Sequence, residues 1–352
     1  MKVKFSRKAL VALFAVSALT LSACSSGGSD DASGDVKVSL ILKNQTNPFF
    51  VSMVKGAEAK AAELGIDLTI SSGKEEGDDA AQIAAIENAI SAKHAGIVIT
   101  VMSTNVNAAI TKAREAGLLV IALDTPTDPA DIADITFATD NREAGRLIGQ
   151  WGAKKLGGQK AVIALLNIFD DRVSPVDYLR DNGFLEGMGI PVNDPNKMAD
   201  EAPKGKYSGG DYEIVGNVAT GANEDGGRAG MEKLLAKNSK INIVYTINEP
   251  TAIGACAALK AAKKSAIVVS VDGGLPGIEA VKSGCIGATS QQYPLRMADY
   301  GLQAIYDLVK TGKKPEVTAG KDFFDTGVTL ITDDPQDGVK SESTQYGIDN
   351  AW

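Results

Sequence analysis

Carboxylate and amide side chains recur at the ends of the apolar runs in this sequence. Asp124 closes the run VIALD, and Asp272 closes the run AIVVSVD. Amides follow two further runs, at Asn248 and at Gln291 and Gln292. A carboxylate can accept hydrogen bonds from two neighbouring hydroxyl groups, while amides donate to other hydroxyls or to a ring oxygen. These side chains therefore suit a neutral ligand that carries several hydroxyl groups.

The stretch NQTNPFF, residues 44–50, adds an amide and two aromatic rings after the first apolar run, which leads to Lys43. Aromatic residues usually belong to a core, and only 5% of this chain is aromatic. One of Phe49 and Phe50 can stack on the apolar face of a sugar ring while Asn47 reaches its hydroxyl groups. The alternative is that one or both rings anchor the start of a helix in the core.

A scaffold of alternating strands and helices would bring these residues together. Parallel sheets covered on both faces bind ligands beyond the carboxyl ends of their strands. Each aspartate alone could be a turn residue, so the prediction depends on their recurrence at strand ends. The predicted strands cover residues 37–42, 66–71, 96–101, 118–123, 160–166, 212–218, 242–246, 266–271 and 286–290. The predicted helices cover residues 48–64, 79–93, 106–116, 142–155, 176–188, 224–236, 251–262 and 294–311.

The length and the connections predict an α/β protein with two domains. One parallel sheet seldom organises the about 315 residues that follow the N-terminal segment. The stretch Pro191–Asp211 is rich in Pro, Gly, Lys and Asp, and we expect a solvated surface insertion there. The polar tail after Thr332 is expected to wrap the surface.

The first 35 residues predict export and a lipid anchor. Four basic residues precede the apolar segment Leu10–Leu21, which is too short for a comfortable membrane span. The following LSAC resembles a bacterial lipoprotein signal, in which residues 1–23 are removed and Cys24 is lipidated. An ordinary secretory signal with an incidental cysteine is the alternative. Residues 24–35 are polar and small, which is typical of a flexible tether.

The composition of the exported chain excludes several functions. Loss of residues 1–23 removes four of the 36 basic residues and none of the 44 acidic ones, which leaves a net charge of −12. Nucleic acids and anionic lipids bind basic surfaces, so neither is an expected partner, and only the lipid anchor would reach the membrane. The single histidine, His94, supplies neither a His-based triad nor a typical zinc site. We expect no catalytic residue, no metal and no cofactor.

The two remaining cysteines, Cys256 and Cys285, lack the spacing of a metal site. From the sequence alone, a disulfide between them stays an open alternative.

Six motifs together resemble a known family. TNPFF, VIALDT, FATDNREAG, INEPTAIGA, VVSVDGGLPG and GATSQQYP occur in the order found in the ribose/galactose-type periplasmic sugar-binding proteins of ABC importers. The similarity covers essentially all of residues 36–330 and looks closest to the fructose-binding members. It implies a type I periplasmic binding protein, in which two Rossmann-like lobes with parallel sheets are joined by three crossing segments and clamp a sugar.

The resemblance also implies domain boundaries and motion. The N-terminal lobe would contain residues 36–138 and 293–324, and the C-terminal lobe residues 139–292 and 325–352. Hinge bending is expected near residues 139–141, 290–294 and 322–326.

Matching motifs imply ligand contacts from both lobes, at Asn47, Phe49, Phe50, Asp124, Asn248, Asp272 and Gln292. One position departs from the family, because many members place an arginine after the strand-end aspartate, where this chain has Thr125. Lys43 is a candidate for the missing donor, unless it is a surface lysine. Arg180 is a second candidate, and Tyr178 competes with it for the same pocket position. Both could instead lie on a helix surface.

The function implied is the substrate-binding component of a carbohydrate ABC importer. It would be monomeric and anchored outside the cytoplasm, delivering a monosaccharide to permease subunits, with fructose the first candidate and ribose or galactose next. The alternative is a lipoprotein that reports a sugar or quorum signal to a receptor. A sugar-responsive repressor would need an N-terminal helix-turn-helix and a basic surface. A nucleotide-dependent enzyme would need a glycine-rich loop after the first strand, where NQTNPFF has no glycine.

Overall fold

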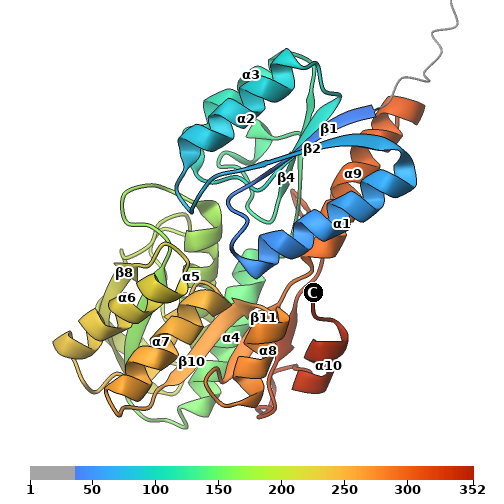
Figure 1. Cartoon of the computed structure of the whole chain (residues 1–352). Helices are drawn as coiled ribbons and strands as arrows, with labels where there is room; N and C mark the ends of the chain where they lie inside the picture. The colour runs from blue at the N-terminus through green and yellow to red at the C-terminus, as the bar shows by residue number, and fades with distance from the viewer. Residues whose placement is uncertain (1–35) are drawn as a thin grey trace, which may run out of the picture. The chain divides into compact units, whose positions relative to one another are not determined.

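The computed structural model describes residues 36–352, so the predicted signal peptide, Cys24 and the tether lie outside the described residues. Two separate sheets organise the described part (Figure 1). The first has the strand order β12-β5-β4-β3-β1-β2, and its paired strands run parallel. Its strands are β1 (Val36–Leu42), β2 (Ile66–Ser72), β3 (Gly96–Ile99), β4 (Leu119–Leu123), β5 (Ile135–Ala138) and β12 (Phe324–Asp325).

The second sheet has the order β13-β11-β10-β9-β6-β8-β7. Its inner pairs are parallel, while β13 and β7 pair antiparallel at the two edges. Its strands are β6 (Ala161–Asn167), β7 (Lys204–Tyr207), β8 (Gly210–Ala219), β9 (Ile243–Thr246), β10 (Ile267–Asp272), β11 (Ala288–Gln291) and β13 (Thr329–Ile331).

Helices cover both faces of the first sheet because its central strands are apolar on both sides. In β1, Leu40 packs with one pair of helices and Ile41 with the other pair, and both side chains are fully buried. The first pair is α1 (Pro48–Leu64) and α9 (Pro294–Thr311), and the second pair is α2 (Asp79–Ser91) and α3 (Asn107–Glu115). A short 3₁₀ turn at Thr104–Val106 precedes α3, and another at Ala130–Ile132 precedes β5.

The second sheet is built the same way. In β6, Leu165 packs toward one helix layer and Leu166 toward the other. The first layer contains α4 (Asn141–Lys155) and α5 (Pro175–Met188), and the second contains α6 (Glu224–Lys237), α7 (Glu249–Ala261) and α8 (Leu275–Lys282). The short helix α10 (Thr344–Asp349) packs against α8 and β13.

The predicted α/β architecture with parallel sheets is confirmed. Each of the nine predicted strands is present, with ends shifted by at most two residues. The sequence analysis missed β5, β7, β12 and β13. Three of these strands are at sheet edges and all are two to four residues long, so they are too short to show a periodic apolar pattern.

The interpretation of Pro191–Asp211 as a solvated insertion was incomplete. Residues 204–207 form β7, an edge strand that pairs with the start of β8. Lys204 and Lys206 are exposed on this strand, and charged residues of this kind protect an edge from pairing with other chains. The tail after Thr332 does more than wrap the surface, because Trp352 reaches Phe49 at the start of α1, with ring centroids 5.4 Å apart.

A disulfide joins Cys256 in α7 to Cys285, which follows α8. The structure therefore contains the disulfide that the sequence alone left open.

The chain passes between the sheets three times. The passages lie between β5 and α4, between β11 and α9, and between β12 and β13. Among residues 36–352, no helix has both the length and the apolar character needed to cross a membrane.

Candidate ligand-binding site

The carboxyl ends of strands from both sheets converge on one small cavity. It has a volume of about 30 Å³ and is lined by all nine residues that the sequence analysis proposed as ligand contacts: Lys43, Asn47, Phe49, Phe50, Asp124, Arg180, Asn248, Asp272 and Gln292. The remaining lining residues are Glu76, Ile168, Val176, Ala222 and Ile247. The predicted convergence of these side chains is thus present, while their contact with a ligand stays a prediction.

Arg180 is the central cation of this site. It is only 4% exposed, so the alternative of a helix-surface residue is wrong. Its guanidinium donates to Asp124 Oδ1 at 3.2 Å and to the Ile247 carbonyl at 3.0 Å, and it lies 3.8 Å from Asp272 Oδ1. Arg180 on α5 therefore links the carboxylate at the end of β4 to the carboxylate at the end of β10.

Asn141 orients this arginine. Its side-chain oxygen accepts from Arg180 Nε at 2.8 Å, and its amide donates to the Asp124 carbonyl at 2.8 Å. The sequence analysis expected only hinge bending near residues 139–141. The structure adds a positioning role for Asn141, since it holds both members of the Arg180–Asp124 pair.

Tyr178 does not compete with Arg180 for the cavity. Its hydroxyl donates to Asp128 Oδ2 at 3.2 Å, and the residue lines a different hollow. Thr125, which stands where many relatives have arginine, donates its hydroxyl to Asp124 Oδ2 at 2.9 Å. Arg180 therefore supplies a positive partner for Asp124 that residue 125 does not.

The two aspartates have unusual backbone geometry. Asp124 has a φ of 61° and Asp272 a φ of 145°, both in the positive region that non-glycine residues seldom occupy. Such conformations concentrate where a side chain must be presented in a fixed direction. Both carboxylates are 4% exposed.

Burial raises the pKa of Asp272 to about 7, while Arg180 and a hydrogen bond from Gln292 oppose the rise. That bond runs from Gln292 Nε2 to Asp272 Oδ1 over 2.8 Å. The carboxylate therefore lacks some of the donors that a buried anion needs. Ligand hydroxyl groups could supply them.

Glu249 holds the turn that follows Asp272. The sequence analysis did not identify this residue. Its carboxylate accepts from the backbone N–H groups of Gly273 and Gly274 at 2.8 and 3.1 Å, and from the Thr289 hydroxyl at 2.8 Å. These bonds fix the turn that follows β10. Burial, together with the nearby Asp272 carboxylate, raises the pKa of Glu249 to about 8.

Both predicted asparagines cap helices. Asn47 Oδ1 accepts from the Phe49 N–H at the start of α1, and Asn248 Oδ1 accepts from the Thr251 N–H at the start of α7. The Asn248 amide also donates to the Ala222 carbonyl at 3.0 Å. Much of the hydrogen-bonding capacity of Asn248 is thus used within the protein, so its predicted contribution to a ligand is smaller than that of the aspartates.

Phe49 and Phe50 serve the core and the cavity together. They are 2% and 3% exposed, belong to the apolar cluster between the first sheet and α1, and also line the cavity. Their rings meet edge to face at 5.4 Å, and Trp352 meets Phe49 in the same way. The two alternatives from the sequence are therefore not exclusive.

Lys43 is buried, so the alternative of a surface lysine is wrong. Its ammonium lies 4.0 Å from Glu76 Oε2. Glu76, which follows β2, was not singled out by any sequence motif.

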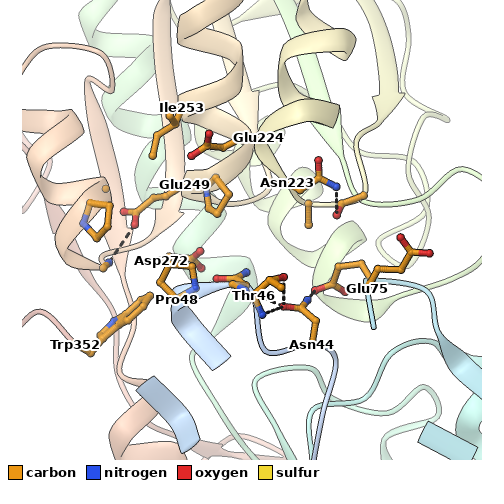
Figure 2. Close-up of a pocket in the computed structure, with 18 residues that line it drawn as sticks. Asn44, Thr46, Pro48, Glu75, Asn223, Glu224, Glu249, Ile253, Asp272 and Trp352 are labelled. Carbon is orange, nitrogen blue, oxygen red and sulfur yellow. Dashed lines mark hydrogen bonds between the residues drawn. The ribbon is translucent and has the colours of Figure 1, made fainter. Parts of the chain in front are cut away.

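A larger hollow of about 410 Å³ adjoins the small cavity (Figure 2). The two share Asn47, Glu76, Ala222 and Asp272. Trp352, Pro48 and Ile253 contribute apolar surface to the larger hollow, and Asn44, Glu75 and Asn223 contribute polar groups.

Loops that flank the two sheets also contact each other directly. Arg172 before α5 donates to the Gly77 carbonyl at 2.7 Å, and the Thr104 N–H donates to the Val173 carbonyl at 3.1 Å. The small cavity has room for only two or three water molecules at about 30 Å³. A sugar ring is larger than this space, so its binding requires the residues around the small cavity to move apart. No group of three or more His, Cys, Asp or Glu side chains in the described region is arranged to hold a metal ion.

The fold and the site define a class of protein. The profile of the periplasmic binding protein domain matches residues 38–314, and the chain belongs to this family. Its relatives are substrate-binding proteins of ABC importers, which confirms the expectation of a binding protein and not an enzyme. Family membership also places the domain outside the cytoplasm.

Particular relatives are named for sugars. The ribose import binding protein of Haemophilus influenzae is 29% identical over 311 residues, covering 88% of this chain and 96% of the relative. The D-allose-binding periplasmic protein of Escherichia coli is 24% identical and covers 86% and 94%. An ABC transporter solute-binding protein from Agrobacterium vitis, crystallised with D-fucose, has a TM-score of 0.73 at 24% identity and covers 90% of this chain and 100% of that chain.

Proposed function

We propose that this protein is the extracytoplasmic substrate-binding component of a carbohydrate ABC importer and holds one monosaccharide between the residues that line the small cavity, which widens to admit it. The observation that carries the proposal is the convergence of Asp124, Asp272, Arg180 and the two phenylalanines on one buried cavity. Two carboxylates and a guanidinium match vicinal hydroxyl groups, and the rings match the apolar face of a sugar.

The proposed lobes are residues 36–138 with 293–324 and residues 139–292 with 325–352. The partition of the strands between the two sheets supports these boundaries. Fructose is our first candidate ligand on the resemblance of the motifs. Ribose and galactose follow, and the relatives named for ribose and allose add allose to the test. Import is favoured over signalling to a receptor, because the relatives include import binding proteins. We expect a monomer that delivers the sugar to permease subunits.

A thermal-shift screen of the purified protein tests the proposed function. D-fructose, D-ribose, D-galactose and D-allose are added separately, and one of them is expected to raise the unfolding temperature by several degrees. A ligand at a hundredfold excess over its Kd stabilises the folded state by about 2.7 kcal/mol. Glycerol at the same concentration controls for general stabilisation by polyols. Unfolding temperatures that no sugar raises above the glycerol control would refute sugar binding.

We further propose that Cys24 carries a lipid that anchors the protein to the membrane. The lipoprotein-like LSAC sequence before the tether supports this proposal. Cys24→Ala is expected to release the protein into the soluble fraction or to block removal of residues 1–23. Fractionation followed by mass spectrometry of the N-terminus measures both. A normally processed Cys24→Ala protein that stays in the membrane fraction would contradict the anchor.

A further inference from the structure

Glu76 is a buried carboxylate in the small cavity that sequence reasoning did not assign. It lies in the loop between β2 and α2, and its side chain is 7% exposed. Oε1 accepts a hydrogen bond from the Asn44 amide at 3.2 Å. Oε2 has no hydrogen-bond partner among the described residues. A buried carboxylate oxygen without a donor is costly, so this atom has unused capacity for a ligand.

Lys43 faces the unpartnered oxygen of Glu76. The 4.0 Å between Lys43 Nζ and Glu76 Oε2 exceeds the length of a hydrogen bond, although the two charges still attract each other. A hydroxyl group can accept from an ammonium and donate to a carboxylate at the same time. One ligand hydroxyl placed beside this pair would therefore satisfy both groups.

The charges of the cavity favour a neutral ligand. Three carboxylates line it, on Glu76, Asp124 and Asp272, against two cations, on Lys43 and Arg180. Burial raises the pKa of Glu76, and the nearby Lys43 opposes the rise. An anionic group would meet this acidic excess in a poorly solvated space, where like charges repel strongly.

We propose that Lys43 and Glu76 form a ligand-binding pair that receives one hydroxyl of a neutral sugar and rejects anionic sugars, sugar phosphates in particular. This inference rests on the proposed function and adds a specificity residue to it. Lys43 donates a hydrogen bond to the hydroxyl oxygen, and Glu76 Oε2 accepts a hydrogen bond from the hydroxyl group. A phosphate oxygen has no proton to donate to Glu76 when fully ionised, so it would leave that carboxylate unpaired and face its charge.

A purely structural role for Glu76 is the competing explanation. Asn44, which Glu76 holds, accepts from the backbone N–H groups of Thr46 and Asn47 at 3.1 and 2.9 Å and so shapes the turn before α1. Glu76→Gln separates the two roles. The glutamine keeps an oxygen for Asn44 but replaces the acceptor beside Lys43 with an amide donor. Glu58→Gln is the matched control, because Glu58 is exposed on α1 and lines neither the small cavity nor the larger hollow.

Isothermal titration calorimetry with D-ribose, D-fructose, D-allose and D-ribose 5-phosphate tests the inference on the purified protein. We expect Glu76→Gln to weaken the binding of the neutral sugars more than tenfold and Glu58→Gln to leave it within twofold. The wild type is expected to bind D-ribose 5-phosphate at least a hundredfold more weakly than D-ribose. In the Glu76→Gln protein, the difference between these two affinities is expected to be smaller. Lys43→Gln should weaken neutral-sugar binding as well, and it supplies a second readout if Glu76→Gln folds poorly.

Two results would overturn the inference. Neutral-sugar affinities that are equal in the Glu76→Gln and Glu58→Gln proteins would assign Glu76 a structural role only. Equal affinity of the wild type for D-ribose and D-ribose 5-phosphate would remove the proposed discrimination. Both results leave sugar binding itself intact. A wild-type protein that binds no sugar would instead overturn the proposed function, and this inference with it.

Discussion

Replacing Arg180 with methionine is expected to weaken sugar binding by about a thousandfold or more. The guanidinium bonds Asp124 Oδ1 and the Ile247 carbonyl and lies 3.8 Å from Asp272 Oδ1. Methionine would leave two buried carboxylates without their cation, and the loss of one partner of a buried ion pair costs about 3–5 kcal/mol. The folded protein should lose stability by a similar amount, which chemical denaturation measures.

Two further variants make the Arg180 prediction specific. Arg180→Lys keeps the charge but loses the planar fork that reaches several acceptors, so intermediate affinity is expected. Arg228→Met is the control, because Arg228 is exposed on α6 and pairs only with Glu232 four residues on. Calorimetry that gives Arg180→Met the same affinity as Arg228→Met would show that Arg180 does not bind the sugar or organise its site.

The second large effect is expected for Asp272→Asn, which should weaken binding by about a hundredfold. A carboxylate that accepts two sugar hydroxyls makes charge-assisted bonds of about 1.5–3 kcal/mol each, and about 1.4 kcal/mol corresponds to a factor of ten. The amide keeps the size of the side chain but loses its charge and one acceptor. Asp225→Asn is the control, because Asp225 is exposed on α6.

The pH dependence of binding gives Asp272 a separate signature. Its pKa is raised by burial to about 7, and hydroxyl donors favour the ionised form. Affinity should therefore be full above this pKa and fall as the pH drops through it, by up to about tenfold per pH unit. Calorimetry between pH 5 and pH 9 measures the trend. An affinity that does not change with pH, or that falls with rising pH, would contradict a role for the ionised Asp272.

The sequence predicted residues that line the small cavity where a residue follows an apolar run. Asp124 and Asp272 end buried parallel strands, and the carboxyl ends of such strands face the same side of a sheet. For that reason, reading the residue after each run identified part of the cavity lining, namely Lys43, Asp124, Asn248, Asp272 and Gln292. Arg180 comes from a helix and was predicted only as a second candidate for the missing arginine donor. Its burial and its contacts required the packing of α5 against the strand ends.

The residues that were missed carry no local signal. Glu75 and Glu76 are adjacent in a charged loop, and only the folded loop shows that Glu76 turns inward while Glu75 stays exposed. Glu249 stands in the first turn of α7, where an acidic residue is explained by the helix dipole alone. Its bonds to Gly273 and Gly274 join segments far apart in the sequence. Trp352 likewise contacts Phe49 across almost the whole length of the chain.

The central claim is tested most directly by calorimetric titration. The wild type and the double variant Asp124→Asn, Asp272→Asn are each titrated with the sugar that raises the unfolding temperature most. The account predicts that one sugar binds the wild type with one-to-one stoichiometry. It predicts no measurable binding to the double variant, because both carboxylate acceptors of the cavity are lost. Wild-type affinity in the folded double variant would contradict the claim that the sugar lies between the ends of the two sheets.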